Sequence, residues 1–270
     1  MQANGICHIQ AVCFAIHSPV RKIGIQKTVE DDSMIKNWRI GIVVVFSLIA
    51  TWLLFVFMKA PLFGIAIFDK DILNFYMGYE LSTIIVSSVF LLVLYLFADK
   101  LRLRYLNLKK IDGVVRPAPL VGIKPKDGEG WKTIGLTIGS IITVVTGIVV
   151  YFQTVSENGL TFRLFPEIPL ILLFALMNSF TEEVIFRLSY TTIVANEKRN
   201  PRISEFLSAA VFGGVHYFGI APSGIAGAVM AAFIGWFLAK SINETKGFFW
   251  AWVIHFAQDV IILFFLFMRN

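Results

Sequence analysis

The chain has 270 residues, of which 57% are hydrophobic and 16% charged, and it carries a formal charge of +6 with a mean hydropathy of +0.73. Soluble domains are about half apolar and about a quarter charged, so this composition excludes an ordinary soluble protein. The apolar residues form long continuous runs without two-residue alternation, which excludes an outer-membrane barrel. We therefore expect an all-α, polytopic bundle of transmembrane helices, because lipid forces backbone groups to pair within helices.

The N-terminal segment 1–33 is mixed and polar, and it lacks the apolar core and cleavage site of a signal peptide. Met34 then begins Met-Ile-Lys-Asn-Trp-Arg, an ordinary cytoplasmic start to a membrane protein. We hypothesise that Met34 is the native initiator and that residues 1–33 are not native. Mass spectrometry that detects those residues in the natural protein would refute this. Cys7 and Cys13 have neither a disulfide framework nor a metal-site spacing, so they are interpreted as incidental thiols.

A helix that crosses a bilayer needs about 20 apolar residues. The segments predicted to span the membrane are 39–58, 74–97, 133–153, 168–194, 203–219, 223–240 and 247–267. The run 60–68 is too short to cross and is expected at the interface, with an eighth span as the alternative. These spans divide the chain into the tail 1–33, a part 34–132 with two spans and a basic loop, and a bundle 133–267 that carries the candidate chemistry.

Lys and Arg residues are distributed unevenly between the two ends of these spans. They concentrate before the first span and in segments 98–132, 197–202 and 240–246, which lie on one side of the predicted membrane. The other side carries Lys59, Lys70, Arg163 and Arg269. This asymmetry predicts a cytoplasmic N-terminus. The positive charge therefore reflects topology, so no nucleic-acid partner is expected, and the loop 98–132 is interpreted as a solvated connector.

Six polar or ionisable residues interrupt the apolar stretches of the C-terminal half. They fall into three groups, Glu182, Glu183 and Arg187, then His216, then His255 and Asp259. A charge at membrane depth costs on the order of several kcal/mol unless it is paired or faces a polar cavity, so the groups predict one shared buried site. Residues four apart share a helix face, so Glu183 is expected to pair with Arg187. Glu182 points about 100° away, toward a different surface.

A carboxylate and an imidazole that converge on a water molecule can remove its proton, and Glu182 with His216 suits this role. A second imidazole with its acid, His255 with Asp259, suits stabilisation of an oxyanion. The same four side chains could instead ligate a divalent metal such as zinc, although the His-Glu-x-x-His helix of zinc proteases is absent from the sequence. Two other interpretations stay open, a polar cluster that only locks the bundle and a proton relay in a transporter.

The ordered set of motifs resembles the CAAX protease and bacteriocin-processing family, also called the Abi family, which is related to the type II CAAX prenyl endopeptidases. The family pattern is Glu-Glu-x-x-x-Arg, Phe-x-x-x-His and His-x-x-x-Asn or Asp, each on a separate span. Here these are Glu182-Glu183-Val-Ile-Phe-Arg187, Phe212-Gly-Gly-Val-His216 and His255-Phe-Ala-Gln-Asp259. The resemblance covers about residues 130–267 of the sequence.

The resemblance implies a role for each motif residue. It implies that Glu182 is the general base and that His216 helps to hold the attacking water. It also implies that His255 and Asp259 stabilise the oxyanion, and that Glu183 and Arg187 support these residues. Asp259 stands where the eukaryotic prenyl-protein proteases have Asn, and the family is described both as metal-dependent and as a metal-free glutamate type. The cofactor therefore stays open, with zinc as one alternative.

These observations predict an intramembrane endopeptidase in the plasma membrane of a prokaryote. Its partner would be a membrane-embedded or lipidated peptide substrate, since the site lies below the lipid headgroups. Leader peptides, bacteriocins and signalling peptides are the substrates expected in such a host. The alternatives are a non-enzymatic bacteriocin-immunity or scaffold protein of the same family, and a proton-coupled transporter. The sequence lacks an evident inverted repeat, which argues against a transporter.

Overall fold

The computed structural model describes residues 23–98, 101, 103–156, 167–219 and 222–268, with side chains described from Trp38 to Phe267. The chain forms two compact units, Met1–Asn37 and Trp38–Asn270. In the first unit, residues 23–33 of the predicted polar tail are helical. The two predicted incidental thiols, Cys7 and Cys13, lie outside the described residues.

The predicted all-α fold is confirmed. The α-helices are α1 (Ile23–Phe57), α2 (Asp71–Phe97), α3 (Trp131–Thr154), α4 (Ile168–Glu183), α5 (Ser189–Asn196), α6 (Arg202–Tyr217), α7 (Gly224–Thr245) and α8 (Phe249–Met268). A π-helical turn, η2 (Val184–Leu188), joins α4 to α5 without a break, and a 3-10 turn, η1 (Pro119–Val121), lies in the loop before α3. Among the described residues, β-structure is limited to two isolated bridges.

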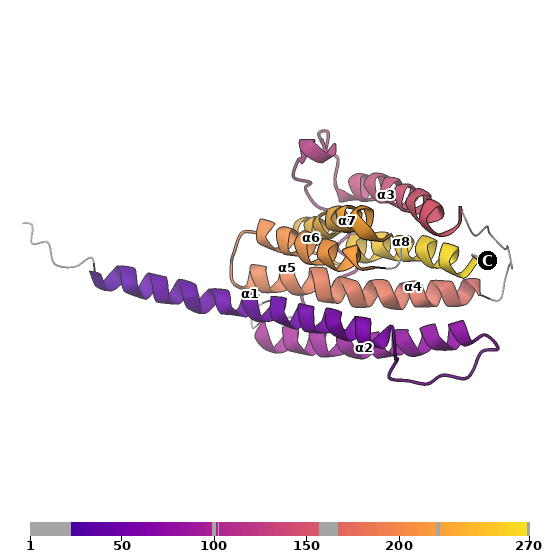
Figure 1. Cartoon of the computed structure of the whole chain (residues 1–270). Helices are drawn as coiled ribbons and strands as arrows, with labels where there is room; N and C mark the ends of the chain where they lie inside the picture. Colours follow the sequence, from indigo (N-terminus) through magenta and orange to yellow (C-terminus); the bar gives the residue numbers. More distant parts are fainter. Residues whose placement is uncertain (1–22, 99–100, 102, 157–166, 220–221, 269–270) are drawn as a thin grey trace, which may run out of the picture. The chain divides into compact units, whose positions relative to one another are not determined.

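The second unit is built around α4 and its continuation through η2 into α5. Helix α4 packs against α2 and α8, α3 packs against α8, and α6 pairs with α7 (Figure 1). Small residues let α6 and α7 approach closely. A Cβ atom on Gly213 would lie 2.8 Å from the Cβ of Ala232, and one on Gly235 would lie 2.6 Å from the carbonyl oxygen of Ser208. This close approach fixes the helix that carries His216.

In the described part of the chain, six segments are long and apolar enough to cross a membrane, namely Trp38–Phe57, Asp71–Phe97, Trp131–Thr154, Ile168–Asn196, Gly224–Thr245 and Phe249–Phe267. The remaining predicted span, 203–219, corresponds to α6, which has only 16 residues. Such a helix is about 24 Å long, whereas the hydrocarbon core is about 30 Å thick. The chain is therefore an integral membrane protein, while the count of seven spans and the cytoplasmic N-terminus stay predictions.

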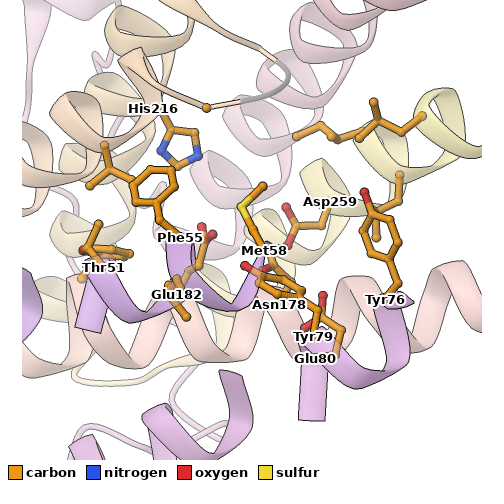
Figure 2. A pocket seen from close by; sticks show the side chains of 17 residues that line it. Thr51, Phe55, Met58, Tyr76, Tyr79, Glu80, Asn178, Glu182, His216 and Asp259 are labelled. Carbon is orange, nitrogen blue, oxygen red and sulfur yellow. Dashed lines mark hydrogen bonds between the residues drawn. The ribbon is translucent and has the colours of Figure 1, made fainter. Parts of the chain in front are cut away.

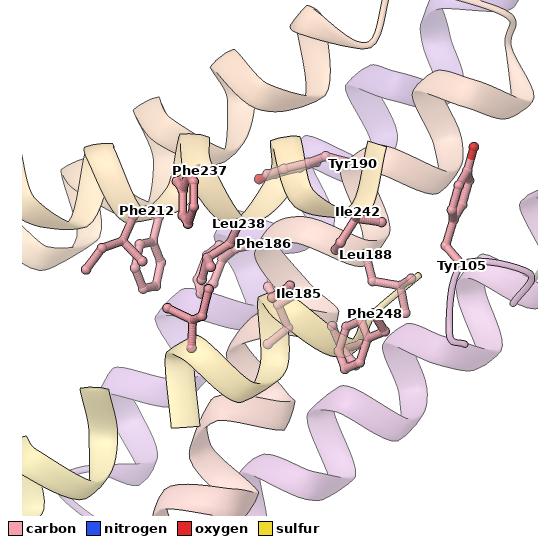
Figure 3. Close-up of a cluster of buried hydrophobic side chains, with 14 of the residues drawn as sticks. Tyr105, Ile185, Phe186, Leu188, Tyr190, Phe212, Phe237, Leu238, Ile242 and Phe248 are labelled. Carbon is pink, nitrogen blue, oxygen red and sulfur yellow. The ribbon is translucent and has the colours of Figure 1, made fainter. Parts of the chain in front are cut away.

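An aromatic and aliphatic core surrounds η2, where this turn meets α6, α7 and α8 (Figure 3). Ile185, Phe186 and Leu188 of η2 are at most 1% exposed, as is Phe237 of α7, and Phe212 of α6 is 2% exposed. Lipid tails are as apolar as these side chains, so in a membrane the core stabilises the bundle through close packing. This rigid core lies next to the polar residues that the sequence singles out.

The loop before α3 is not the solvated connector that the sequence suggests. Its Arg116 donates from Nε to Oε1 of Glu244 on α7 at 2.6 Å, across 128 residues of sequence. At the start of α3, Trp131 donates from Nε1 to Oε2 of Glu244 at 2.9 Å. Trp250 of α8 donates to the carbonyl oxygen of Ile111 at 2.7 Å. The described part of the loop is therefore docked on α7 and α8, through partners that local charge and proline content do not reveal.

Candidate active site

The imidazole of His255 lies among three carboxyl groups contributed by α4 and α8. Its Nδ1 donates a hydrogen bond to Oε1 of Glu183 at 2.6 Å. Its Nε2 lies 3.3 Å from Oε2 of Glu182 and 3.6 Å from Oδ1 of Asp259. His255 and Asp259 are one turn apart on α8, and the two glutamates are adjacent on α4. The packing of α4 against α8 therefore brings four of the predicted site residues together around one ring.

The two neighbouring glutamates approach different nitrogens of the same imidazole. The side chain of Glu183 is fully buried, whereas that of Glu182 keeps 15% exposure and lines a cavity. Glu182 and Glu183 therefore have different surroundings, as their adjacent positions predict. Their shared contact with His255 was not predicted, because that ring comes from another helix and the spacing of residues within α4 does not reveal it.

A buried ion pair lies next to the imidazole of His255. NH1 of Arg187 lies 3.2 Å from Oε1 of Glu183, and both side chains are fully buried. The guanidinium carbon of Arg187 also lies 3.6 Å from the centroid of the Phe212 ring. A permanently charged guanidinium at membrane depth requires such partners, and the carboxylate and the aromatic face supply them. Arg187 itself lies in the π-helical turn η2, a type of turn frequent at functional sites.

A cavity of about 160 Å³ opens beside this group (Figure 2). Its polar lining consists of Thr51, Tyr76, Tyr79, Glu80, Asn178, Glu182, His216 and Asp259. The rest of the wall is apolar and includes Leu54, Phe55, Met58, Ile262, Leu263 and Leu266. We call this space the catalytic cavity. It combines polar side chains, among which a reaction could occur, with apolar walls suited to a substrate within the membrane.

His216 reaches the catalytic cavity from α6, on the side opposite Glu182 (Figure 2). Its Nδ1 lies 3.0 Å from the carbonyl oxygen of Phe212. A carbonyl oxygen only accepts, so Nδ1 carries the hydrogen and Nε2 is left as an acceptor. The ring of Phe212 contacts both His216 and His255, with centroids 4.1 and 5.6 Å away. The structure therefore places His216 in the same cavity as Glu182 and Asp259, positioned by Phe212.

Residues 164–261 match the family model described as Type II CAAX prenyl endopeptidase Rce1-like. The chain contains an Rce1-like domain. This match confirms the resemblance to the type II CAAX prenyl endopeptidases over residues 164–261, which are less than half of the chain. All six motif residues lie within the matched segment, whereas α1, α2 and α3 precede it. No match to the chain was found among curated proteins or among solved structures.

The Rce1-like domain includes one polar contact that the sequence analysis missed, and α2 adds a second polar residue from outside the domain. Asn178 donates from Nδ2 to Oδ2 of Asp259 at 3.0 Å. Glu80 of α2 is 2% exposed and lines the catalytic cavity. Signals for both exist in the sequence. Asn178 precedes Glu182 by four residues and therefore shares its face of α4, and Glu80 is an isolated acid within a predicted span.

The alternative of a divalent metal makes a geometric demand on the Rce1-like site. Within the described parts of the chain, no group of three or more His, Cys, Asp or Glu side chains is placed to hold a metal ion. Nδ1 of His255 is already engaged by Glu183, and His216 approaches from the other side of the cavity. In this arrangement Glu182, His216, His255 and Asp259 are not gathered into a preformed metal site, and the divalent metal stays a prediction.

Proposed function

We propose that this chain is an intramembrane endopeptidase that hydrolyses peptide bonds of membrane-associated or lipid-modified peptides in the plasma membrane of a prokaryote. The observation that supports the proposal most is the single cavity that joins Glu182, His216 and Asp259 beside His255. A cluster that only locked a bundle would be sealed. Here a carboxylate, an accepting imidazole nitrogen and apolar walls face one shared space.

In the proposed mechanism, Glu182 and His216 activate the hydrolytic water. The carboxylate of Glu182 takes a proton as the water oxygen attacks the scissile carbonyl carbon. Nε2 of His216 accepts the second hydrogen of that water and holds its lone pair toward the carbonyl, because Nδ1 donates to Phe212. When the carbon–nitrogen bond breaks, the proton held by Glu182 passes to the leaving amine. One water is consumed, and a carboxylic acid and an amine are formed, each carrying one of its hydrogens.

His255 and Asp259 are proposed to stabilise the oxyanion. With Nδ1 donating to Glu183, Nε2 faces carboxyl oxygens of Glu182 and Asp259, so the contact is favourable when Nε2 also carries a hydrogen. An Nε2–H at this position can donate to the carbonyl oxygen as negative charge develops on it. Glu183 keeps the ring in this orientation, and Asn178 holds the carboxyl of Asp259 through Oδ2.

The proposal is tested by peptidomics of membranes and medium from cells that carry wild type, Glu182→Gln or Asp127→Asn at matched levels. Gln keeps the size of Glu but cannot accept the proton, so cleavage should fall about 100- to 10,000-fold. Asp127 is an exposed carboxylate in the loop before α3 and serves as the matched control. A peptide cleaved by wild type and Asp127→Asn, but not by Glu182→Gln, supports the proposal and supplies the substrate.

The same experiment distinguishes the non-enzymatic immunity or scaffold protein. That alternative is favoured by the fully buried pair of Glu183 and Arg187, which ties η2 to α4. Identical peptidomes, together with a host phenotype that Glu182→Gln retains, would leave the scaffold role and end the enzyme proposal. A transporter would instead show solute movement that depends on the proton gradient and is lost in Glu182→Gln.

A further inference from the structure

A second, smaller cavity adjoins the catalytic cavity. It measures about 30 Å³ and is lined by Thr146 of α3, Gln258 of α8 and the side chains of His216, His255 and Asp259. His216, Asp259 and Ile262 line both cavities, so the two spaces share part of their walls. We call the second space the rear cavity. It therefore adjoins the proposed hydrolytic centre.

Two residues that line the rear cavity, Thr146 and Gln258, each have a buried side-chain oxygen without a hydrogen-bond partner among the described residues, Oγ1 and Oε1 respectively. These residues are only 1% and 2% exposed, respectively. The amide of Gln258 is held in place, because its Nε2 donates to Oγ1 of Thr143 at 2.7 Å. Buried polar groups in native proteins nearly always have a partner, either a protein group or an ordered water. The rear cavity therefore has fixed polar atoms that need a small ligand.

Water fits this demand in both size and chemistry. A bound water needs about 10–15 Å³ of cavity volume and two to four polar partners. The rear cavity measures about 30 Å³, and its lining residues Gln258 and Thr146 carry an amide oxygen that can accept and a hydroxyl that can donate and accept. A peptide side chain or a lipid chain is too large for it. We propose that the rear cavity is a water-binding site that supplies the hydrolytic centre.

The supply role, unlike the binding site itself, rests on the proposed peptidase function. Each cleavage consumes one water, whose oxygen joins the acyl carbon and whose hydrogens end on the two products. A substrate in the catalytic cavity covers its apolar walls and closes the direct path to bulk water. A water held by Thr146 and Gln258 then lies on the far side of His216 and Asp259 from the substrate. It can replace the consumed water without passing through lipid.

Binding is tested first, by X-ray footprinting of the full chain carrying Glu182→Gln, which needs no activity. Radiolysis of a bound water oxidises nearby side chains, and Met230 lines the rear cavity. Met177 of α4 lines neither of these cavities and serves as the internal reference. Thr146→Val removes the hydroxyl at nearly constant volume, so oxidation of Met230 should fall several-fold relative to Met177. Thr146→Ser keeps the hydroxyl and should restore the oxidation.

Supply is tested by steady-state kinetics on the substrate that the peptidome identifies. Thr146→Val and Gln258→Met should each lower kcat about tenfold with little change in KM, the effect of one lost hydrogen bond to the water. Thr146→Ser should rescue kcat. A role of Thr146 in folding alone would lower thermal stability and leave kcat per folded molecule unaffected.

Each outcome decides a separate point. Equal oxidation of Met230 in Thr146→Val and in the parent overturns the water site, even if Glu182→Gln abolishes cleavage. Reduced oxidation with wild-type kcat in Thr146→Val overturns the supply role. Reduced oxidation without any detectable peptidase supports the binding site, overturns its role in hydrolysis and counts against the proposed function.

Discussion

A single carboxylate oxygen, Oε1 of Glu183, accepts the hydrogen of His255 Nδ1 at 2.6 Å and lies 3.2 Å from NH1 of Arg187. The orientation of a proposed catalytic ring and the neutralisation of a buried cation therefore depend on the same atom. Glu182, one residue earlier, contacts the same ring but faces the catalytic cavity. The two glutamates should consequently respond differently to the same substitution.

Glu183→Gln should destabilise the protein strongly, because it leaves Arg187 charged and without its carboxylate at membrane depth. The expected loss in the free energy of unfolding is about 3–5 kcal/mol. Glu182→Gln should lose much less, since the ion pair of Arg187 is with Glu183 and stays intact. Unfolding of both variants in detergent measures the difference. The double variant Glu183→Gln/Arg187→Met should recover most of the stability, and failure to recover would contradict the ion-pair explanation.

Asn178→Leu should reduce the rate of cleavage without unfolding the bundle. The substitution keeps the size of the side chain but removes the hydrogen bond from Nδ2 to Oδ2 of Asp259. A fall of about tenfold in kcat is expected, since Asp259 loses one fixed donor. Asn178→Asp should reduce kcat further, because it places a second carboxylate against Asp259. Wild-type kcat in both variants would show that Asn178 does not position the site.

The adjacent glycines of α6 should differ sharply in their tolerance of alanine. A Cβ on Gly213 would lie 2.9 Å from the carbonyl oxygen of Ala228, whereas nothing lies within 4 Å of one on Gly214. Gly213→Ala should cost about 1–3 kcal/mol of stability and displace His216. Gly214→Ala should be neutral or stabilise the helix by about 0.5–1 kcal/mol. Thermal unfolding of the two variants checks this, and equal effects would exclude close helix packing as the reason.

Lys198→Gly should stabilise the turn between α5 and α6. Lys198 is exposed and has a φ of 53°, the left-handed region that costs a side chain about 1–2 kcal/mol and a glycine little. A gain of up to about 1 kcal/mol in the free energy of unfolding is therefore expected. Lys198→Ala removes the same charge but keeps the Cβ atom, so it should give no gain. A gain of equal size in both variants would assign the effect to the charge.

The fold class and the pairing of Glu183 with Arg187 follow from the sequence because both depend on local patterns. Continuous apolar runs dictate transmembrane helices, and the four-residue spacing of Glu183 and Arg187 dictates their contact. The length of α6 was harder to predict, because the apolar character of 203–219 continues past the point where the helix ends, at Tyr217. Hydropathy reports where a chain is apolar, and it does not report where a helix stops.

The contacts between helices could not be predicted from one sequence. The bond from His255 to Glu183 joins residues 72 positions apart, and no spacing rule applies at that distance. The π-helical turn around Arg187 changes which residues share a helix face, and the sequence of Val184–Leu188 does not predict this turn. Glu80 is recognisable as an isolated acid within a predicted span, but its position in the catalytic cavity follows only from the structure.

The docking of the loop before α3 limits where the chain can be truncated without losing contacts to α7. Glu244 takes hydrogen bonds from Arg116 and from Trp131, and Trp131 is completely buried. A fragment that began at residue 133, where the predicted helix bundle starts, would keep every motif residue and lose both donors. Its Glu244 would keep the ion pair with Lys240 and lose the one with Arg116. The smallest fragment worth reconstituting therefore starts upstream of Arg116, so that it includes the loop that contacts α7 and α8.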